Sequence, residues 1–85
     1  MNFIFSQHAL EQMKERGISK ETVENIVTNP DQIMTLEDLT VFQGIEKGDK
    51  TLFLIRVFVN IRKNPNVVVT VYRTSKIDKY YEGKI

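Results

Sequence analysis

The most clearly patterned part of the chain reads Val67-Val68-Val69-Thr70-Val71-Tyr72-Arg73-Thr74-Ser75-Lys76. It begins as a run of β-branched residues, which is typical of a strand buried on both faces. It ends in polar groups: a phenol, a guanidinium, two hydroxyls and an amine. This ending fits the rim of a phosphate site, and it also fits an ordinary strand terminus.

Three segments before this strand have the alternating pattern of β-strands and cover residues 32–36, 39–45 and 51–61. In the longest segment the odd positions are uniformly apolar, and we expect them to face helices. These positions are Phe53, Ile55, Val57 and Val59. Together with residues 67–73, the pattern predicts four antiparallel strands.

Two helices are predicted ahead of the strands. Ser6 is a suitable N-cap for a helix over residues 7–16, and Gly17 suits its left-handed end. Ser19 is the N-cap of a second helix, which ends at Asn29-Pro30 because proline disfavours a helical residue before it. The short connection between them predicts a tight αα-hairpin.

Both ends of the chain carry weaker signals. Residues 3–5 fit either a short edge strand or a hydrophobic staple ahead of the first helix. Residues 76–81 fit a final short helix capped by Ser75. We therefore expect residues 1–85 to form one α+β domain. In it, an N-terminal αα-hairpin packs on one face of a four-stranded antiparallel sheet.

Composition excludes several classes of site and location. The chain has no cysteine, so it has neither disulfides nor thiolate metal sites, and its single histidine argues against an imidazole metal cluster. The longest apolar stretch is broken by Arg56 and is too short to span a bilayer. The N-terminus does not have the pattern of a signal peptide. We expect a cytoplasmic protein with no membrane partner, no metal and no cofactor.

Charge is divided unevenly along the chain. Residues 1–49 hold four Lys/Arg and nine Asp/Glu, a balance of −5, whereas residues 50–85 hold eight and two, a balance of +6. This division indicates either an anionic partner for the second half or two halves that neutralise each other in the fold.

His8 and Arg56 are the first candidates for chemistry. His8 has the only side chain that ordinarily titrates near neutrality, and it falls in the first turn of the first helix. It is either a plain exposed histidine or a group that overhangs a groove. Arg56 interrupts an apolar strand, so it must be paired in a salt bridge or open onto an anion site.

The end of the last strand supplies further candidates. Arg73 and Ser75 share one face of an extended strand, where a guanidinium and a hydroxyl can hold a phosphate. Tyr72 and Thr74 share the other face. The basic and aromatic residues that follow suit phosphates and unstacked bases, but they also fit a solvated helix whose tyrosines cover the sheet. These residues are Lys76, Lys79, Tyr80 and Tyr81.

Several catalytic motifs are missing from the sequence. It has no phosphate-binding glycine loop, no metal-ligand spacing and no nucleophile elbow. Phosphodiester chemistry on such a chain would be independent of metal. RNA permits this, because its own 2′-hydroxyl can attack the neighbouring phosphorus when a base, a cation and an acid are supplied.

Three segments together resemble a small bacterial domain-of-unknown-function family, numbered 4258. They are Phe5-Ser6-Gln7-His8-Ala9, Lys14-Glu15-Arg16-Gly17-Ile18-Ser19 and Val68-Val69-Thr70-Val71-Tyr72-Arg73-Thr74-Ser75-Lys76. That family is more remotely similar to RelE/ParE-like toxins and to metal-independent ribonuclease toxins. The resemblance implies helices followed by a four-stranded antiparallel sheet.

The resemblance also implies roles for individual residues. It makes His8 the base or acid, Arg56 the group that stabilises charge on the phosphate, and Arg73 and Ser75 the groups that hold the scissile phosphate. The further RNA-binding candidates are Tyr72, Thr74, Lys76, Lys79 and Tyr80.

Two functions follow as expectations. The first is a toxin-like, metal-independent endoribonuclease whose partners are RNA and a cognate antitoxin protein. Its low net charge of +1 departs from that of a strongly basic toxin directed at the ribosome. The second is a non-catalytic module, either a ParE-like inhibitor of a protein target or an inactive family member.

Overall fold

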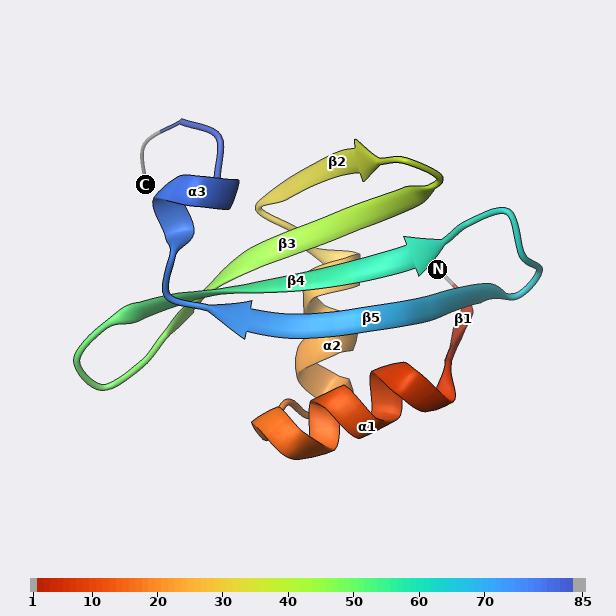
Figure 1. The fold of residues 1–85 in the computed structure, drawn as a ribbon, viewed down its shortest axis with the longest axis horizontal. Helices are drawn as coiled ribbons and strands as arrows, with labels where there is room; N and C mark the ends of the chain where they lie inside the picture. Colours follow the sequence, from red (N-terminus) through yellow and green to blue (C-terminus); the bar gives the residue numbers. More distant parts are fainter. Residues whose placement is uncertain (1, 84–85) are drawn as a thin grey trace.

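This computed structural model describes residues 2–83. Within this range, five strands form one sheet in the order β1-β5-β4-β3-β2, and three helices accompany it (Figure 1). The elements are β1 (Phe3–Phe5), α1 (Gln7–Arg16), α2 (Lys20–Thr28), β2 (Gln32–Leu36), β3 (Leu39–Lys47), β4 (Leu52–Asn60), β5 (Asn66–Thr74) and α3 (Ile77–Tyr80).

The sheet is mixed, which corrects the predicted four-stranded antiparallel sheet. Strands β2 to β5 pair antiparallel in chain order, but β1 joins the edge as a fifth strand and pairs parallel with β5. Phe3 lies opposite Asn66 and Phe5 opposite Val68. The edge-strand alternative for residues 3–5 is confirmed, but three residues carry too little periodicity to choose it over a hydrophobic staple, and a parallel pair with the distant end of the chain leaves no local signal.

Helix α1 continues the cover that β1 gives to the edge of β5. The Val71 amide donates to Gln12 Oε1 at 2.9 Å, and the Val71 carbonyl accepts from Arg16 at 3.4 Å. The Ser6 hydroxyl donates to the Val69 carbonyl at 3.3 Å. Side chains of α1 thus bond backbone groups that an uncovered sheet edge would leave exposed.

The helix caps agree with the sequence, but the αα-hairpin prediction is wrong. Ser6 accepts from the Ala9 amide, Ser19 accepts from the Thr22 amide, and Gly17 adopts φ 65°. However, α1 contacts β5 whereas α2 contacts β3 and β4, and the two helices run in different directions (Figure 1). A short connection fixes where the helices end, and packing on different strands fixes how they are oriented.

The core lies between the sheet and helices α1 and α2. Ile55, Val57 and Val59 of β4 are buried against Ala9 and Met13 of α1, as the alternating pattern predicts. Residues at even positions of β4 point to the opposite face, which α3 partly covers (Figure 1). We call this second face the α3 face.

Helix α3 differs from its prediction in its cap. Lys76, rather than Ser75, occupies the N-cap position and makes no side-chain cap bond. The helix is a single turn held by one buried residue, Ile77. Within residues 2–83, every helix is too short or too polar to cross a membrane.

Candidate anion-binding site on the α3 face

Arg56 is the centre of a polar cluster on the α3 face. Strand register places it between Gln43 of β3 and Tyr72 of β5, so the three side chains project from neighbouring strands to one side of the sheet. Only 5% of Arg56 is exposed, and Gln43 is fully buried. The alternating pattern of β4 therefore carries a guanidinium into the interior of the α3 face.

Neutral groups hold the Arg56 guanidinium. Its Nε donates to Gln43 Oε1 at 2.9 Å, one terminal nitrogen donates to the Tyr72 hydroxyl at 2.7 Å, and the other contacts Met34 Sδ at 3.5 Å. Aromatic rings complete the enclosure, because the Arg56 Cζ lies 4.4 Å from the centre of the Tyr80 ring and 5.1 Å from that of Phe58.

This guanidinium is buried without a carboxylate. Among residues 2–83 the ion pairs are Arg62 with Asp38 and Arg73 with Glu46, and neither includes Arg56. Burying a charge is costly unless an opposite charge or strong hydrogen bonds offset the loss of water. Cation–π contacts and neutral acceptors offset part of this cost. The site therefore retains a positive field that an anion would complete.

Two tyrosines beside Arg56 have shifted acidities in opposite directions. Burial raises the pKa of Tyr72, and the hydrogen bond and positive charge of Arg56 oppose that rise. The neighbouring Lys79 ammonium, followed by the Tyr72 hydroxyl, lowers the pKa of Tyr80. The Lys79 nitrogen lies 5.3 Å from the Tyr80 ring centre. Tyr80 is thus the more acidic phenol of the pair.

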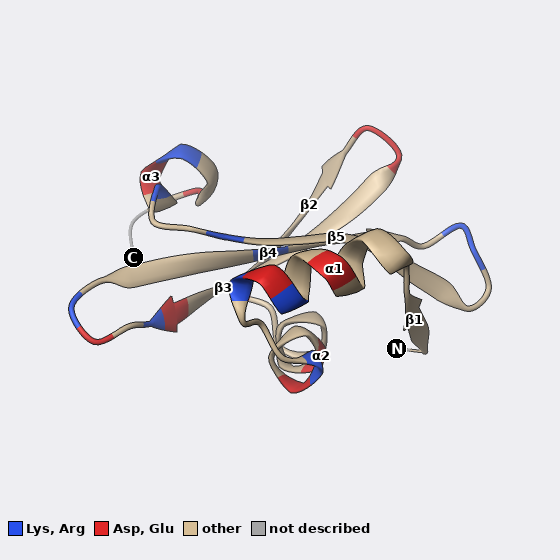
Figure 2. Cartoon of the chain, turned by 60° about the horizontal axis from the view of Figure 1, so that its bottom comes forward, with Lys and Arg blue, Asp and Glu red and all other residues tan. Residues whose placement is uncertain are grey.

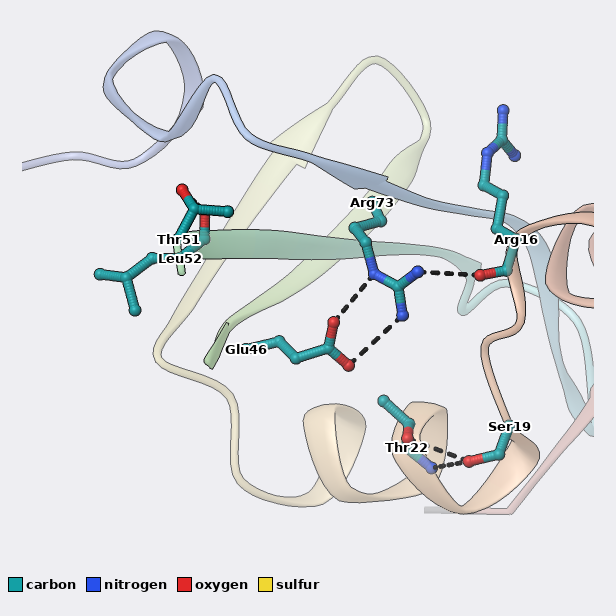
Figure 3. A network of polar contacts seen from close by, with 7 residues as sticks. All are labelled: Arg16, Ser19, Thr22, Glu46, Thr51, Leu52 and Arg73. Carbon is teal, nitrogen blue, oxygen red and sulfur yellow. Dashed lines mark hydrogen bonds and ion pairs between the residues drawn. The ribbon is translucent and has the colours of Figure 1, made fainter. Parts of the chain in front are cut away.

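Arg73 lies on the opposite face of the sheet from Arg56. Its Nε donates to Glu46 at 2.8 Å, a second nitrogen reaches the other Glu46 oxygen at 3.4 Å, and a third donates to the Arg16 carbonyl at 2.8 Å (Figure 3). The guanidinium ties the end of β5 to β3 and to the last residue of α1. These bonds occupy the guanidinium nitrogens of Arg73 that would otherwise bind a phosphate.

The other predicted residues are divided between the two faces. His8 is exposed in the first turn of α1, which packs on the face opposite Arg56. Ser75 and Lys76 are exposed between β5 and α3, and the Thr74 hydroxyl accepts from the Lys76 amide at 3.0 Å. The structure therefore brings together Arg56, Tyr72, Tyr80 and Lys79, and it separates them from His8 and Arg73.

Sequence reasoning missed Gln43 and Gln32. Gln43 links Arg56 to Gln32 Oε1 at 2.8 Å and to the Tyr80 carbonyl at 3.1 Å. A signal was present, since Gln43 is the polar residue in the apolar run Val41-Phe42-Gln43-Gly44-Ile45. Gln43 lies directly opposite Arg56 in the pairing of β3 with β4, so each of these polar residues accounts for the presence of the other in an apolar strand.

Other parts of the described chain offer little to a ligand. A small cleft lies between β1 and α2, lined by Asn2, Phe3, Phe5, Glu24 and Thr28, and none of the predicted site residues lines it. Within residues 2–83, no group of three or more metal-ligating side chains is clustered. The polar cluster around Arg56 is therefore the candidate functional site.

The α+β fold and its polar cluster define a small domain with a buried cationic site, and sequence comparison gives its family. Residues 5–73 match the family described as domain of unknown function (DUF4258), and the chain belongs to that family. No curated protein and no solved structure matches the chain significantly. The family match includes Arg56 and Tyr72 and stops before α3, so Lys79 and Tyr80 lie outside it.

Proposed function

We propose that this protein is a toxin-like, metal-independent endoribonuclease that cleaves RNA through attack of the 2′-hydroxyl. The observation that carries the proposal is the buried Arg56 guanidinium, which lacks a carboxylate in the described chain and lies among Tyr72, Tyr80 and Gln43. A fixed cation in a site that excludes water suits the charge that develops on a phosphate during transfer.

In this proposal Tyr80, Arg56 and Tyr72 of the α3 face have separate roles in the reaction. Tyr80, as phenolate, takes the proton of the 2′-hydroxyl, and the 2′-oxygen forms a bond to phosphorus. Arg56 stabilises the charge on the non-bridging oxygens. The bond to the 5′-oxygen breaks, and Tyr72 or water protonates that oxygen. The products are a 2′,3′-cyclic phosphate and a free 5′-hydroxyl.

This division moves the acid–base role away from His8. The imidazole lies across the sheet from Arg56, and a general base must come within hydrogen-bond reach of the proton that it removes. Tyr80 is the better candidate, because it lies on the α3 face beside Arg56 and its pKa is lowered by Lys79.

The first experiment is incubation of the protein with long single-stranded RNA in excess EDTA, beside Tyr80→Phe and His8→Ala. We expect cyclic-phosphate ends from the parent and from His8→Ala, and a loss of at least about a hundredfold for Tyr80→Phe, since general-base catalysis contributes ~10²–10⁴. Cleavage by Tyr80→Phe at the parent's rate would remove Tyr80 from the reaction.

A pH profile tests the same assignment in another way. Because the reaction needs the phenolate, the rate should rise with pH and level off above an apparent pKa. That apparent pKa should be lower than the ordinary tyrosine pKa of 10.0. Arg56→Lys keeps the charge and should lower the rate without moving that pKa, since Lys79 is the main cause of the shift. A profile that follows the titration of histidine would contradict the assignment and return His8 to the site.

The proposal includes a protein partner. An acidic or amphipathic segment of a cognate antitoxin would cover the basic second half of the chain, whose balance is +6. Expression with the neighbouring genes should then yield a complex, and its absence from such preparations would count against the toxin assignment.

The separation of the predicted residues favours a second candidate. His8 and Arg73 lie on the opposite face from Arg56, and Arg73 is engaged by Glu46, so the set implied by the family resemblance is not assembled. A non-catalytic module that binds a protein target needs no such set. No RNA products at high protein concentration, together with a stable complex with a protein, would support it.

A further inference from the structure

Residues 80–82 lie across the α3 face and are held there by two glutamine side chains. Gln43 Nε2 donates to the Tyr80 carbonyl at 3.1 Å. Gln32 Oε1 accepts from the Glu82 amide at 3.0 Å, while Gln32 Nε2 donates to the Glu82 carbonyl. The two glutamines also bond each other at 2.8 Å, so they form a continuous amide network under this segment.

This segment closes the site around Arg56. The Tyr80 ring lies 4.4 Å from the guanidinium carbon, and only 5% of Arg56 is exposed. A phosphate in solution cannot reach the terminal nitrogens of Arg56 while the Tyr80 ring stays in this position. The site proposed above is therefore shut in this conformation.

The attachment of this segment is weak compared with the core. Helix α3 has four residues and a single buried side chain, and it packs mainly on β4. Gln32 belongs to the edge strand β2 and is only partly buried. Segments with few buried apolar contacts and solvent-exposed hydrogen bonds open at low free energy.

We infer that residues 80–82 are a strap that opens to admit an RNA phosphate to Arg56, and that Gln32 and Gln43 are the latch that holds it closed. This inference rests on the proposed function for the identity of the ligand. The closed population lowers apparent affinity, because only the open fraction of the protein can bind. Weakening the latch should then strengthen RNA binding.

The test compares Gln32→Ala with Gln7→Ala, a matched control on α1. Gln7 is exposed and bonds only Glu11, so its loss leaves the α3 face unchanged. The probe is a fluorescent 2′-O-methyl oligoribonucleotide, which lacks the attacking hydroxyl and cannot be cut by this route. Hydrogen exchange at the Tyr81 amide, which donates to the Ile77 carbonyl at 2.8 Å, reports on opening of this segment without depending on Gln32 as its acceptor.

We expect Gln32→Ala to bind the probe at least about fivefold more tightly and to exchange the Tyr81 amide faster, since each lost hydrogen bond shifts a two-state population by roughly that factor and Gln32 makes two to Glu82. Gln7→Ala should match the parent in both measurements. A merely structural role for Gln32 would weaken binding or leave it unchanged, so a gain is specific to the strap.

The outcomes separate this inference from the proposed function. Faster exchange without tighter binding would overturn the strap, and so would a failure of both parent and Gln32→Ala to bind the probe. Tighter binding by Gln32→Ala with no cyclic-phosphate ends from natural RNA would support the strap and contradict catalysis. RNA cleavage by the parent, together with equal affinities of the parent and Gln32→Ala for the probe, would support catalysis and contradict the strap.

Discussion

Two arginines of the same sheet show how surroundings decide a residue's role. Arg73 meets both oxygens of Glu46 and a carbonyl of α1, so its charge is neutralised within the fold. Arg56 meets an amide oxygen, a phenol, a thioether and aromatic rings, which satisfy its donors but not its charge. From sequence both arginines were candidates for binding phosphate, because the pairing of Arg73 with Glu46 is not visible there.

We predict that Arg73→Gln lowers the free energy of unfolding by about 1–2 kcal/mol and leaves RNA cleavage at the parent's rate. Glu46 and the Arg16 carbonyl lose a donor, but side-chain exposures of 27% and 33% in the ion pair moderate the loss. Urea unfolding gives the free energy, and cyclic-phosphate ends give the rate.

The control for this prediction is Arg62→Gln. Arg62 pairs with Asp38 at 3.2 Å, with both side chains more than two-thirds exposed, at 72% and 78%. Such a pair should contribute less than about 1 kcal/mol. Loss of cleavage in Arg73→Gln with unchanged stability would place Arg73 in the site after all.

At the scale of elements, local sequence patterns predicted the features that depend on residues close together in the chain. The serine caps and Gly17 fixed the bounds of α1 and α2, and the long apolar alternation located β4. The parallel pairing of β1 and the glutamine contacts of residues 80–82 join positions more than 35 residues apart in sequence. The sequence allowed an edge strand at residues 3–5, but no local pattern specifies such contacts, so the parallel pairing of β1 and the closed site emerged only in three dimensions.

We predict that Phe3→Ala destabilises the protein by about 1–3 kcal/mol, because Phe3 is a partly buried member of the core. It should also speed hydrogen exchange at the Asn66 amide, which donates to the Asn2 carbonyl at 3.3 Å, if β1 is a true strand. A hydrophobic staple would leave that amide unaffected.

Ile61→Ala is the matched control for β1. Ile61 is apolar and 51% exposed beyond the end of β4, so its truncation should change stability by less than about 0.5 kcal/mol. Equal losses for Phe3→Ala and Ile61→Ala would mean that β1 adds nothing beyond ordinary surface contact.

At the scale of the whole molecule, the two charged halves neutralise each other only in part. Both ion pairs of the described residues, Arg62–Asp38 and Arg73–Glu46, join the basic half to the acidic half. Acidic and basic residues are mixed along α1, α2 and α3, whereas the loop between β4 and β5 carries basic residues (Figure 2). Helix α3 and this loop lie at opposite ends of the sheet (Figure 1).

This arrangement gives a last prediction about salt. If RNA is held at the α3 face, its phosphates meet Arg56, Lys76 and Lys79, and the logarithm of affinity should fall with the logarithm of salt with a slope of about −2. Lys76→Gln should make the slope shallower by about 0.7, as one fewer phosphate is neutralised. Anisotropy of the 2′-O-methyl probe across a salt series measures both values.

Lys63→Gln is the control, because it makes the same charge change in the loop between β4 and β5. The molecule extends 37 Å along its longest axis, whereas charges are screened beyond about 8 Å at physiological salt. Lys63→Gln should therefore leave the slope unchanged. If it shifts the slope as much as Lys76→Gln does, RNA follows the whole basic half and no site is localised at Arg56. A slope near zero for the parent would mean that its partner is not a polyanion, which favours a protein target.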